Sequence, residues 1–317
     1  MSIFIVTGAA GFIGSNVVKA LNDRGHHDVI AVDNLTVGDR FRNLRDLSIA
    51  DYLDHRDFRE RIRDDRDPWG DVAAVLHQGA CADTTEADGR FMMDNNYEAS
   101  KEILHWCLKR QIPLVYASSA SVYGNGTTCI EDPSYEGPLN VYAYSKLQFD
   151  RYVRRLMPRL ESTVVGLRYF NVYGPREQFK GRMASMVYQL WKQLRDHGAC
   201  RLFEGTGGYG DGEQRRDFVY PGDVAAVNLH FAASPSPVRG IFNCGTGESR
   251  SFNDIARTLI GLLGGGRIDY IPFPESLAGK YQSFTQADIS RLRQAGYASP
   301  MTRLEDGIRS MIEQSHE

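Results

Sequence analysis

The chain has 317 residues, enough for one large domain or two unequal domains with a sizeable buried core. It is 42% hydrophobic and 24% charged, and its formal net charge of −3 gives no indication of a nucleic-acid partner. Five scattered cysteines without a CxxC motif argue against a disulfide framework and a structural zinc site, so we expect no metal ion. The N-terminus lacks the basic region of a signal peptide, and no apolar run approaches the roughly 20 residues that span a bilayer. We therefore expect a cytoplasmic protein without a membrane partner.

The first half of the chain alternates short apolar runs with amphipathic segments. The apolar runs predict strands at residues 3–8, 28–33, 71–80, 112–120 and 163–171. The amphipathic segments predict helices at about residues 12–24, 88–110 and 142–157. Continuous apolar strands between helices indicate a parallel sheet that is covered on both faces. Right-handed crossovers then give an α/β fold with a doubly wound, Rossmann-type sheet.

The alternation ends after Val172. A glycine-rich loop at 204–214 precedes a predicted helix that ends near residue 233, and residues 241–247 are predicted to form one more core strand. Residues 264–282 contain too much proline and glycine to continue the sheet regularly. We therefore expect a Rossmann domain made of residues 1–172 and 216–261. A smaller, C-terminal substrate-binding lobe is expected from residues 173–215 and 262–317.

The segment "TGAAGFIG" places Gly8, Gly11 and Gly14 between a predicted strand and a predicted helix. Glycines at this spacing allow a tight turn and a close approach of the backbone to a pyrophosphate. The N–H groups at the start of the helix then bind the phosphate oxygens. The strand–turn–helix context therefore predicts a dinucleotide site.

The residues after the second predicted strand bear on which dinucleotide is bound. Asp33 ends that strand, 19 residues after Gly14, and a carboxylate there accepts a hydrogen bond from a free ribose hydroxyl and repels a 2′-phosphate. Arg40 and Arg42 follow closely and would neutralise that phosphate. These residues leave the choice between NAD and NADP open.

A second group of polar residues predicts acid/base chemistry. Ser119 follows a predicted strand, at the edge of the sheet where ligands bind in such folds. Tyr142 stands four residues before Lys146, which places both side chains on one face of a helix. Because a nearby ammonium stabilises a phenolate, we expect the pKa of Tyr142 to lie well below its usual value of about 10. Tyr142 would then act as a base while Ser119 polarises the reacting oxygen; Tyr144 is expected to pack rather than react.

Together these segments resemble the extended short-chain dehydrogenase/reductases that act on nucleotide sugars, over nearly the whole chain. The resemblance rests on the glycine turn, the strand-end serines, the YxxxK pair, "RYFNVYGPRE" and "RRDFVY". Narrower segments resemble the ADP-glyceromanno-heptose 6-epimerases of that family, namely "MMDNNY", "PREQFKGRMAS", "RLFEG" and "IPFPESLAGKYQSFTQAD". The resemblance implies an isomerase that inverts C6 of ADP-heptose for the lipopolysaccharide inner core.

Inversion of an unactivated carbinol carbon requires transient oxidation by a nicotinamide and return of the hydride to the opposite face. The resemblance implies that Tyr142 and Lys180 are the two acid/base groups, one for each pose of the sugar. It also implies that Lys146 positions Tyr142 and the nicotinamide ribose. Taken from its own segment, Lys180 is also compatible with a solvated surface charge or a phosphate contact.

The resemblance further implies one tightly bound NADP per subunit. Arg40 would face the 2′-phosphate, and His55 stands where a lysine can help to hold the cofactor. The expected cofactor contacts are Gly8, Gly11, Phe12, Ile13, Gly14, Asp33, Asn34, Arg40, His55, Gln78, Gly79, Ala80, Cys81, Asn95, Lys146 and Val172.

The ADP-heptose substrate is expected to contact mainly the smaller lobe. The expected contacts are Asn171, Arg182, Gln189, Phe203, Glu204, Gly205, Thr206, Arg216 and Tyr281. Arg216 is the expected pyrophosphate clamp, since a guanidinium pairs with phosphate oxygens, and the alternative is an ion pair with Asp217. Arg182 and Gln189 depart from the residues usual in the family, and the loop at 204–214 is longer than usual.

Other functions remain compatible with the sequence. One is another nucleotide-sugar epimerase or a 4,6-dehydratase of the same fold, although a dehydratase is expected to carry acidic residues near Ala120 and Ser121. Another is a dinucleotide-sensing protein without catalysis, which would not need Tyr142 and Lys146. The resemblance also implies a homo-oligomer, specifically a pentamer.

Overall fold

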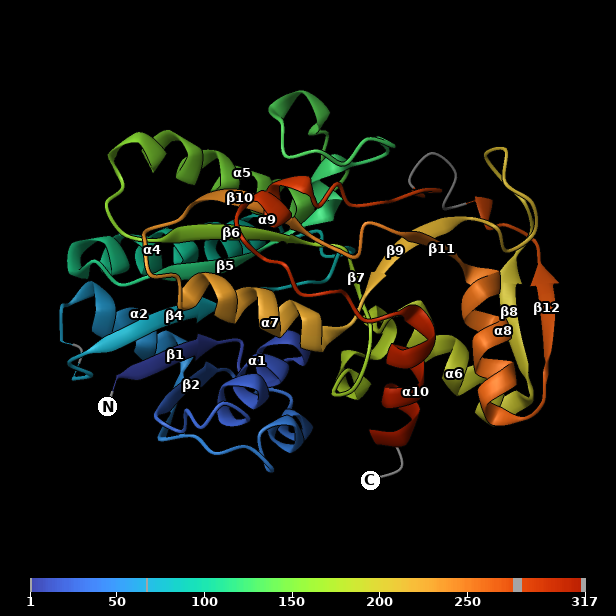
Figure 1. Ribbon diagram of the computed structural model, residues 1–317, viewed down its shortest axis with the longest axis horizontal. Coiled ribbons are helices and arrows are strands. Elements are labelled where there is room, and N and C mark those ends of the chain that lie inside the picture. Colours follow the sequence, from blue (N-terminus) through green and yellow to red (C-terminus); the bar gives the residue numbers. More distant parts are fainter. Residues whose placement is uncertain (1, 67, 276–280, 315–317) are drawn as a thin grey trace.

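The computed structural model describes residues 2–66, 68–275 and 281–314, and it consists of two lobes of unequal size (Figure 1). The larger lobe is built on a sheet of seven parallel strands. In spatial order these are β10 (Arg239–Cys244), β6 (Val164–Tyr169), β5 (Leu114–Ser119), β4 (Val72–His77), β1 (Ile3–Thr7), β2 (Val29–Asp33) and β3 (Asp51–Asp54). The chain starts at β1 and winds outward from it in both directions. The predicted doubly wound parallel sheet is therefore confirmed.

Helices cover both faces of this sheet. One face packs against α1 (Phe12–Asn22), α7 (Pro221–Ala232) and α9 (Ser290–Gln294). The other face packs against α2 (His55–Arg63), α4 (Ala99–Arg110) and α5 (Val141–Leu156). Ile5 and Val6 are both fully buried in β1 but belong to these two different cores. Because neighbouring residues of a strand point to opposite faces, burial on both faces produces the continuous apolar runs seen in the sequence.

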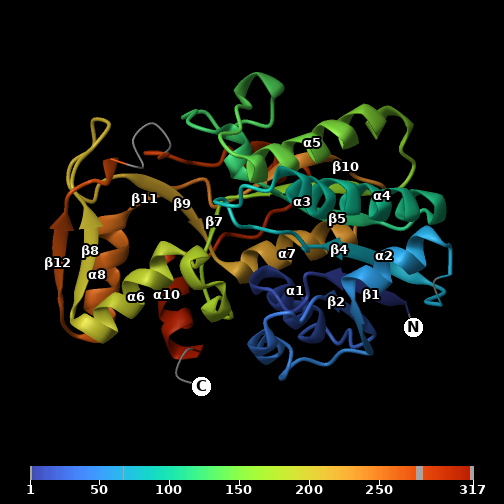
Figure 2. The same ribbon diagram turned by 180° about the vertical axis from the view of Figure 1, so that it is seen from behind.

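The smaller lobe has its own apolar core, between three helices and a pair of parallel strands. Its helices are α6 (Met186–His197), α8 (Phe252–Leu263) and α10 (Leu304–Gln314), and its strands are β8 (Ala199–Phe203) and β12 (Arg267–Ile271). A three-stranded sheet links it to the larger lobe, in the order β11 (Ser249–Ser251), β9 (Arg215–Val219) and β7 (Asn171–Val172). Figures 1 and 2 show this linking sheet between the two lobes.

Several short helical segments join these elements. They are η1 (Gly38–Asn43), α3 (Gly89–Met93), the π-helical η2 (Asp94–Glu98), η3 (Ala120–Tyr123), η4 (Pro133–Tyr135), η5 (Met157–Arg159) and η6 (Gln178–Met183). The helix predicted at 88–110 is thus three consecutive segments, α3, η2 and α4. The strand β3 was not predicted, because Leu53 is its only buried residue and the edge of a sheet leaves little apolar signal.

The helix α8 bears on the division into domains. Its buried residues Phe252, Ile255 and Leu259 pack into the core of the smaller lobe, with α6 and α10. The predicted division assigned most of this helix to the Rossmann domain. We propose instead that the smaller lobe includes α8 and that the boundary follows β10. Within the described ranges, no helix has the length and apolar character that crossing a bilayer requires.

Candidate active site

The turn between β1 and α1 approaches neighbouring backbone so closely that it leaves no room for side chains. Gly8 has a φ of +66°, and a Cβ atom there would lie 2.7 Å from the backbone nitrogen of Gly79. A Cβ atom on Gly14 would lie 2.0 Å from the carbonyl oxygen of Gly8. Helix α1 begins directly after this turn, at Phe12, and no side chain caps its first N–H groups. A close backbone approach and uncapped helical N–H groups fit the pyrophosphate of a dinucleotide.

A cavity of about 760 Å³ opens at this turn, along the carboxyl ends of β1, β2 and β4. This is where doubly wound sheets bind their ligands. The predicted cofactor residues that line it are Gly8, Gly11, Phe12, Ile13, Gly14, Asp33, Asn34, Arg40, His55, Gln78, Gly79, Ala80, Cys81 and Asn95. Thr36, Asn43, Arg56 and Phe179 also line it and were not predicted. Two predicted cofactor contacts, Val172 and Lys146, do not line this cavity; Val172 packs against the sheet core from β7.

Asp33 and Arg40 lie where β2 ends. The buried carboxylate of Asp33 accepts hydrogen bonds from the backbone N–H groups of Ala10 and Asn34, at 2.8 and 2.7 Å. Burial raises the pKa of Asp33, although these bonds and the Arg40 guanidinium oppose the shift. Arg40 lines the cavity, whereas Arg42 is exposed and pairs with the carboxylate of Asp39 at 3.5 Å. Of these two arginines, Arg40 is the one placed to act on a bound dinucleotide.

Ser119 and Tyr142 meet between the end of β5 and the first turn of α5. Asn140 starts this helix, because its side chain accepts a hydrogen bond from the backbone N–H of Ala143 at 2.8 Å. The Ser119 hydroxyl oxygen accepts hydrogen bonds from the Ser121 hydroxyl at 2.8 Å and from the Ser121 backbone N–H at 3.2 Å. The Ser119 hydroxyl also acts on the Tyr142 phenol, whose pKa it lowers. The predicted role of Ser119, to polarise the reacting oxygen beside Tyr142, stays a prediction.

The predicted lowering of the Tyr142 pKa is wrong in direction. Burial raises the pKa of Tyr142, and the Ser119 hydroxyl only partly offsets this rise. The Lys146 ammonium donates a hydrogen bond to the carbonyl oxygen of Ala117 at 2.9 Å. Burial lowers the pKa of Lys146 itself to about 8. Tyr142 and Lys146 both interact electrostatically with Cys81, which places the pair beside the cavity that Cys81 lines.

Lys180 lies in η6, the segment that runs between the two lobes. Its Nζ is 5.2 Å from the centre of the Phe12 ring, and its side chain lines the dinucleotide cavity. Burial lowers the pKa of Lys180, while the Glu177 carboxylate opposes this shift. Among residues 2–66, 68–275 and 281–314, no group forms a hydrogen bond or ion pair with this ammonium. Lys180 is therefore a partly buried lysine in the wall of the cavity, and its role in the reaction stays a prediction.

The chain just before Lys180 is fastened to the larger lobe by two asparagines. The side chain of Asn43 donates a hydrogen bond to the carbonyl oxygen of Arg176 at 3.1 Å, and that of Asn16 donates to the carbonyl oxygen of Pro175 at 3.1 Å. Asn16 lies in α1, directly after the glycine turn. These hydrogen bonds therefore fix the position of the segment that carries Lys180 relative to the dinucleotide site.

Glu177 holds the same segment from inside. Its fully buried carboxylate accepts hydrogen bonds from the backbone N–H groups of Gly174 and Ser185, at 3.0 and 2.7 Å, and from the Ser185 hydroxyl at 2.8 Å. The sequence interpretation did not assign a role to Glu177. Glu177 stands among other charged and polar residues, directly after the "GPR" turn, so its sequence context does not indicate that it is buried.

Arg182 and Gln189, the two departures from the family pattern, both have partners within the chain. The Arg182 guanidinium donates to the Asp83 carboxylate at 2.9 Å and to the Thr85 hydroxyl at 2.6 Å, across the mouth of the cavity. The Gln189 amide donates to the carbonyl oxygens of Ala184 and Arg182, at 2.7 and 3.3 Å. In this structure both side chains join parts of the chain to one another, and their predicted role as substrate contacts stays a prediction.

Arg216 is buried in the smaller lobe and stacks on aromatic rings. Its guanidinium carbon is 5.0 Å from the centre of the Tyr281 ring and 5.7 Å from that of Phe252. Burial lowers the pKa of Arg216. The alternative ion pair with Asp217 is excluded, because adjacent residues of β9 point to opposite faces and the Asp217 carboxylate accepts three backbone N–H groups, among them that of Thr246 at 2.7 Å. The described part of the chain gives Arg216 no carboxylate partner.

The other predicted substrate contacts also lie on the smaller lobe or on the linking sheet. Phe203 ends β8 and its ring centre is 6.2 Å from that of Tyr281. Glu204, Gly205 and Thr206 follow in the loop, and Asn171 is exposed in β7. None of these predicted contacts lines the cavity of the dinucleotide turn. The predictions thus fall into two sets, one at the cavity and one on the smaller lobe.

Known proteins match this chain over most of its length. Residues 4–245 match the NAD-dependent epimerase/dehydratase family. The chain is 55% identical over 311 residues to the ADP-L-glycero-D-manno-heptose-6-epimerase of Alkalilimnicola ehrlichii, covering 98% of this chain and 97% of that protein. Its structure resembles Helicobacter pylori ADP-L-glycero-D-manno-heptose-6-epimerase, with a TM-score of 0.84 and 31% identity over 99% of this chain and 96% of the other.

A further solved structure with the same fold is Thermus thermophilus UDP-glucose 4-epimerase in complex with NAD. It has a TM-score of 0.80 and 27% identity, covering all of this chain and 99% of the other. The chain belongs to the NAD-dependent epimerase/dehydratase family.

Proposed function

We propose that this protein interconverts ADP-D-glycero-D-manno-heptose and ADP-L-glycero-D-manno-heptose by inverting C6, with NADP as its cofactor, in lipopolysaccharide inner-core formation. The observation that carries the proposal is a second lysine, Lys180, partly buried in the wall of the dinucleotide cavity. A site that oxidises and reduces a sugar in a single pose needs one acid/base group, which Tyr142 supplies. A site that binds the same carbon in two poses needs a second acid/base group, and Lys180 is placed to be that group.

The residues of the cavity fit the cofactor. The Gly8–Gly14 turn would hold the pyrophosphate on the start of α1, Asp33 would accept from the adenine ribose, and Arg40 would face the 2′-phosphate. Lys146, beside the other end of the cavity, would hold the nicotinamide ribose. When bound, the nicotinamide takes a hydride from C6 of the sugar and returns it to the opposite face of the resulting ketone.

The side chains of Tyr142 and Lys180 would transfer the proton of the C6 hydroxyl. Burial raises the pKa of Tyr142 and lowers that of Lys180. The Tyr142 phenol therefore retains its proton more strongly than a free tyrosine, and the Lys180 amine releases its proton more readily than a free lysine. These shifts suit Lys180 Nζ to accept a proton from the hydroxyl in one pose and Tyr142 Oη to donate a proton to the carbonyl oxygen in the other.

The smaller lobe would bind the ADP part of the substrate. Arg216 is a buried cation without a carboxylate partner in the described chain, and a diphosphate supplies the missing negative charge. Its stacking on Tyr281 fixes the plane of the guanidinium fork. Phe203 and Tyr281 offer aromatic surface beside it.

Incubation with ADP-D-glycero-D-manno-heptose in deuterated water, without added reductant, tests the proposal. We expect the 6-epimer to form without deuterium at C6, because the hydride returns from the cofactor. Absence of the 6-epimer would overturn the assignment, and deuterium at C6 would replace hydride return by a deprotonation route. UDP-glucose, offered in parallel, is expected to remain unchanged; its 4-epimerisation would favour the alternative function.

We infer from the family resemblance that the enzyme works in the cytoplasm as a homo-oligomer, specifically a pentamer. Multi-angle light scattering of the purified protein measures its mass directly. A mass equal to one chain of 35.6 kDa would contradict this inference.

A further inference from the structure

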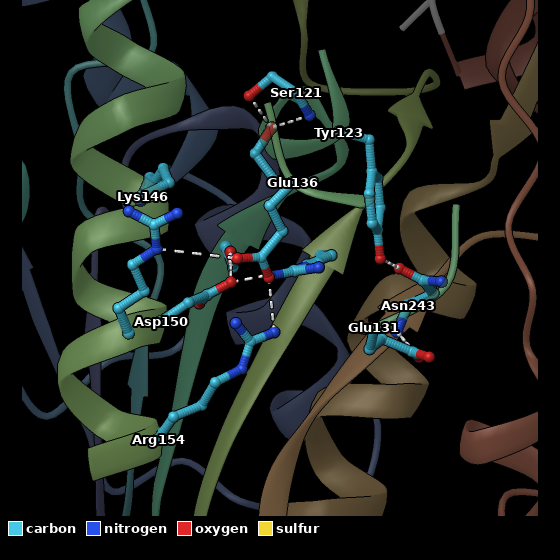
Figure 3. A network of polar contacts seen from close by, with 12 residues as sticks. Ser121, Tyr123, Glu131, Glu136, Lys146, Asp150, Arg154 and Asn243 are labelled. Atoms are coloured by element: carbon cyan, nitrogen blue, oxygen red, sulfur yellow. Dashed lines mark hydrogen bonds and ion pairs between the residues drawn. The ribbon is translucent and has the colours of Figure 1, made fainter. Parts of the chain in front are cut away.

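A cluster of charged groups lies fully buried beside Lys146, between α5 and the strands β5 and β6 (Figure 3). At its centre is Arg168 in β6, whose guanidinium is inaccessible to solvent and forms ion pairs with Asp150 and Glu136. Arg154 reaches Glu136 from the outer end of the cluster, at 2.6 Å. We call Tyr116, Ser118, Glu136, Asp150 and Arg168 the Asp150 cluster.

Asp150 is the member that faces the active site. Its carboxylate accepts hydrogen bonds from the Tyr116 hydroxyl at 3.0 Å, the Ser118 hydroxyl at 2.9 Å and the Arg168 guanidinium at 2.9 Å. Asp150 has no solvent exposure. These three hydrogen bonds, one of them from a guanidinium, fix the orientation of the buried carboxylate. Because buried ion pairs contribute little to stability on balance, the cluster calls for an explanation other than stability.

The cluster is linked to Lys146 through both α5 and β5. Lys146 and Asp150 are four residues apart on α5 and share one face of the helix, as Figure 3 shows. The Lys146 ammonium donates to the carbonyl oxygen of Ala117, and the next residue of β5, Ser118, donates to Asp150. Ala117 and Ser118, two successive residues of β5, therefore form hydrogen bonds with Lys146 and Asp150, respectively.

Lys146 has few other charges around it. From β4 it is near His77, which burial and Lys146 keep neutral by lowering its pKa to about 3. From the following loop Cys81 acts on its charge, and from its own helix Asp150 does. Within the described part of the chain, Asp150 is the one carboxylate that acts on the charge of Lys146. Burial favours the neutral amine, and Asp150 favours the ammonium.

We propose that Asp150 is a positioning residue of the active site, whose carboxylate, fixed by Tyr116, Ser118 and Arg168, keeps Lys146 as an ammonium beside Tyr142. The role of Lys146 in catalysis rests on the proposed function, whereas its charge state does not. Burial alone would favour the neutral amine of Lys146, and the Asp150 carboxylate offsets this effect. Asp150 itself touches neither substrate nor cofactor in this assignment.

Asp150→Asn tests the proposal, since it keeps the shape of the side chain and removes its charge. Without the carboxylate the pKa of Lys146 falls, so the ammonium is lost at lower pH. We expect the alkaline limb of the pH profile of kcat/KM to move to lower pH by about one unit or more, as loss of a nearby opposite charge does. Tyr116→Phe is the matched control, because it removes one hydrogen bond to the same carboxylate and leaves the charge. Its alkaline limb is expected to stay in place.

A second measurement reads Lys146 directly and does not depend on turnover. Competitive acetylation of the wild-type protein with bound NADP, followed by mass spectrometry of the Lys146 peptide over a range of pH, gives the titration of its amine. We expect Lys146 to titrate near pH 8 in the wild type and lower in Asp150→Asn. A Lys146 that is already neutral at pH 6 in the wild type would overturn the proposal without any variant. Unchanged titration and an unchanged alkaline limb in Asp150→Asn would overturn it as well. If ADP-heptose is not epimerised, the proposed function is wrong. The titration of Lys146 still shows whether Asp150 controls the charge of that lysine.

Discussion

The proposed active site has two lysines, and the structure holds them in different ways: Lys146 is buried, whereas Lys180 is partly buried and lines the cavity. Lys146 lies on the regular helix α5, its ammonium bonded to the Ala117 carbonyl and supported by the buried Asp150. Lys180 lies on η6, a short 3₁₀ segment between the lobes, and its ammonium rests over the Phe12 ring without a hydrogen bond from the described residues. Burial lowers the pKa of both.

The difference separates two tasks that a lysine performs in such a site. A cation that orients a tyrosine and a cofactor needs fixed partners, and Lys146 has them. A group that accepts and returns a proton needs a pKa closer to neutrality and a free lone pair when deprotonated, and Lys180 has no hydrogen-bond partner in the described chain to compete for it. The η6 segment positions Lys180 through its backbone and through Glu177 rather than through the lysine side chain itself.

The largest effect is expected from Lys180→Met. Methionine keeps most of the side-chain volume but removes the proton-transferring nitrogen, so we expect epimerisation to fall by about 10²–10⁴-fold. NADP binding, measured by fluorescence titration, is expected to stay within a few-fold of the wild type. Lys192→Met, on the exposed face of α6, is the matched control and should retain full turnover. Loss of NADP binding in Lys180→Met would instead identify Lys180 as a phosphate contact, and near-normal turnover would deny it any part in the reaction.

Glu177→Gln tests whether the backbone of η6 positions Lys180. The amide of glutamine has one acceptor oxygen where the carboxylate has two, which leaves a buried N–H of Gly174 or Ser185 without a partner. We expect the free energy of unfolding to fall by about 1–3 kcal/mol, the cost of such an unpaired group. Since Lys180 also loses a nearby negative charge, its pKa should fall further, and the pH profile of kcat should shift to lower pH. Ser185→Ala, which removes one donor and keeps the charge, should cost stability without moving the profile; equal profiles in all three proteins would contradict a positioning role.

The two lysine sites differ in how far the sequence alone predicted them. The glycine turn, Ser119, Tyr142 and Lys146 were found because each depends on a local pattern: a strand followed by a tight turn, or a four-residue spacing on a helix. The same four-residue spacing gave the wrong pKa direction for Tyr142. Desolvation by the surrounding fold outweighs a nearby charge there, and burial cannot be read from spacing.

Features built from distant segments escaped prediction. Asp150, Arg168 and Glu136 come from α5, β6 and the loop before α5, and no local pattern joins them. Asn43 likewise reaches Arg176 across 133 positions of the chain. The strand β3 was missed because it lies at the edge of the sheet and buries little apolar surface. The role of Lys180 came from the family resemblance, since its segment alone does not show that the cavity wall buries it.

Arg40→Ser addresses the dinucleotide end of the cavity, away from both lysines. We expect NADP binding to weaken by about 10- to 100-fold, the size of one charge-assisted hydrogen-bond pair, while NAD binding stays the same. Calorimetric titration with each dinucleotide measures both values. Arg42→Ser, which changes an exposed arginine outside the cavity, serves as the control and should bind NADP like the wild type. An equal loss for NAD and NADP in Arg40→Ser would mean that Arg40 does not read the 2′-phosphate.

Arg182→Ala is expected to have the smallest effect, although Arg182 lies only two residues from Lys180. Its guanidinium is engaged with Asp83 and Thr85, and its side chain is 71% exposed, so the ion pair is of the weak, solvent-screened kind. We expect KM for ADP-heptose and kcat to stay within about threefold of the wild type, because weak surface pairs carry little energy. Asp83→Asn removes the same ion pair from its other end and should give the same small change. A large rise in KM for Arg182→Ala, but not for Asp83→Asn, would show that Arg182 leaves Asp83 to bind the substrate, and that η6 then supplies a substrate contact as well as Lys180.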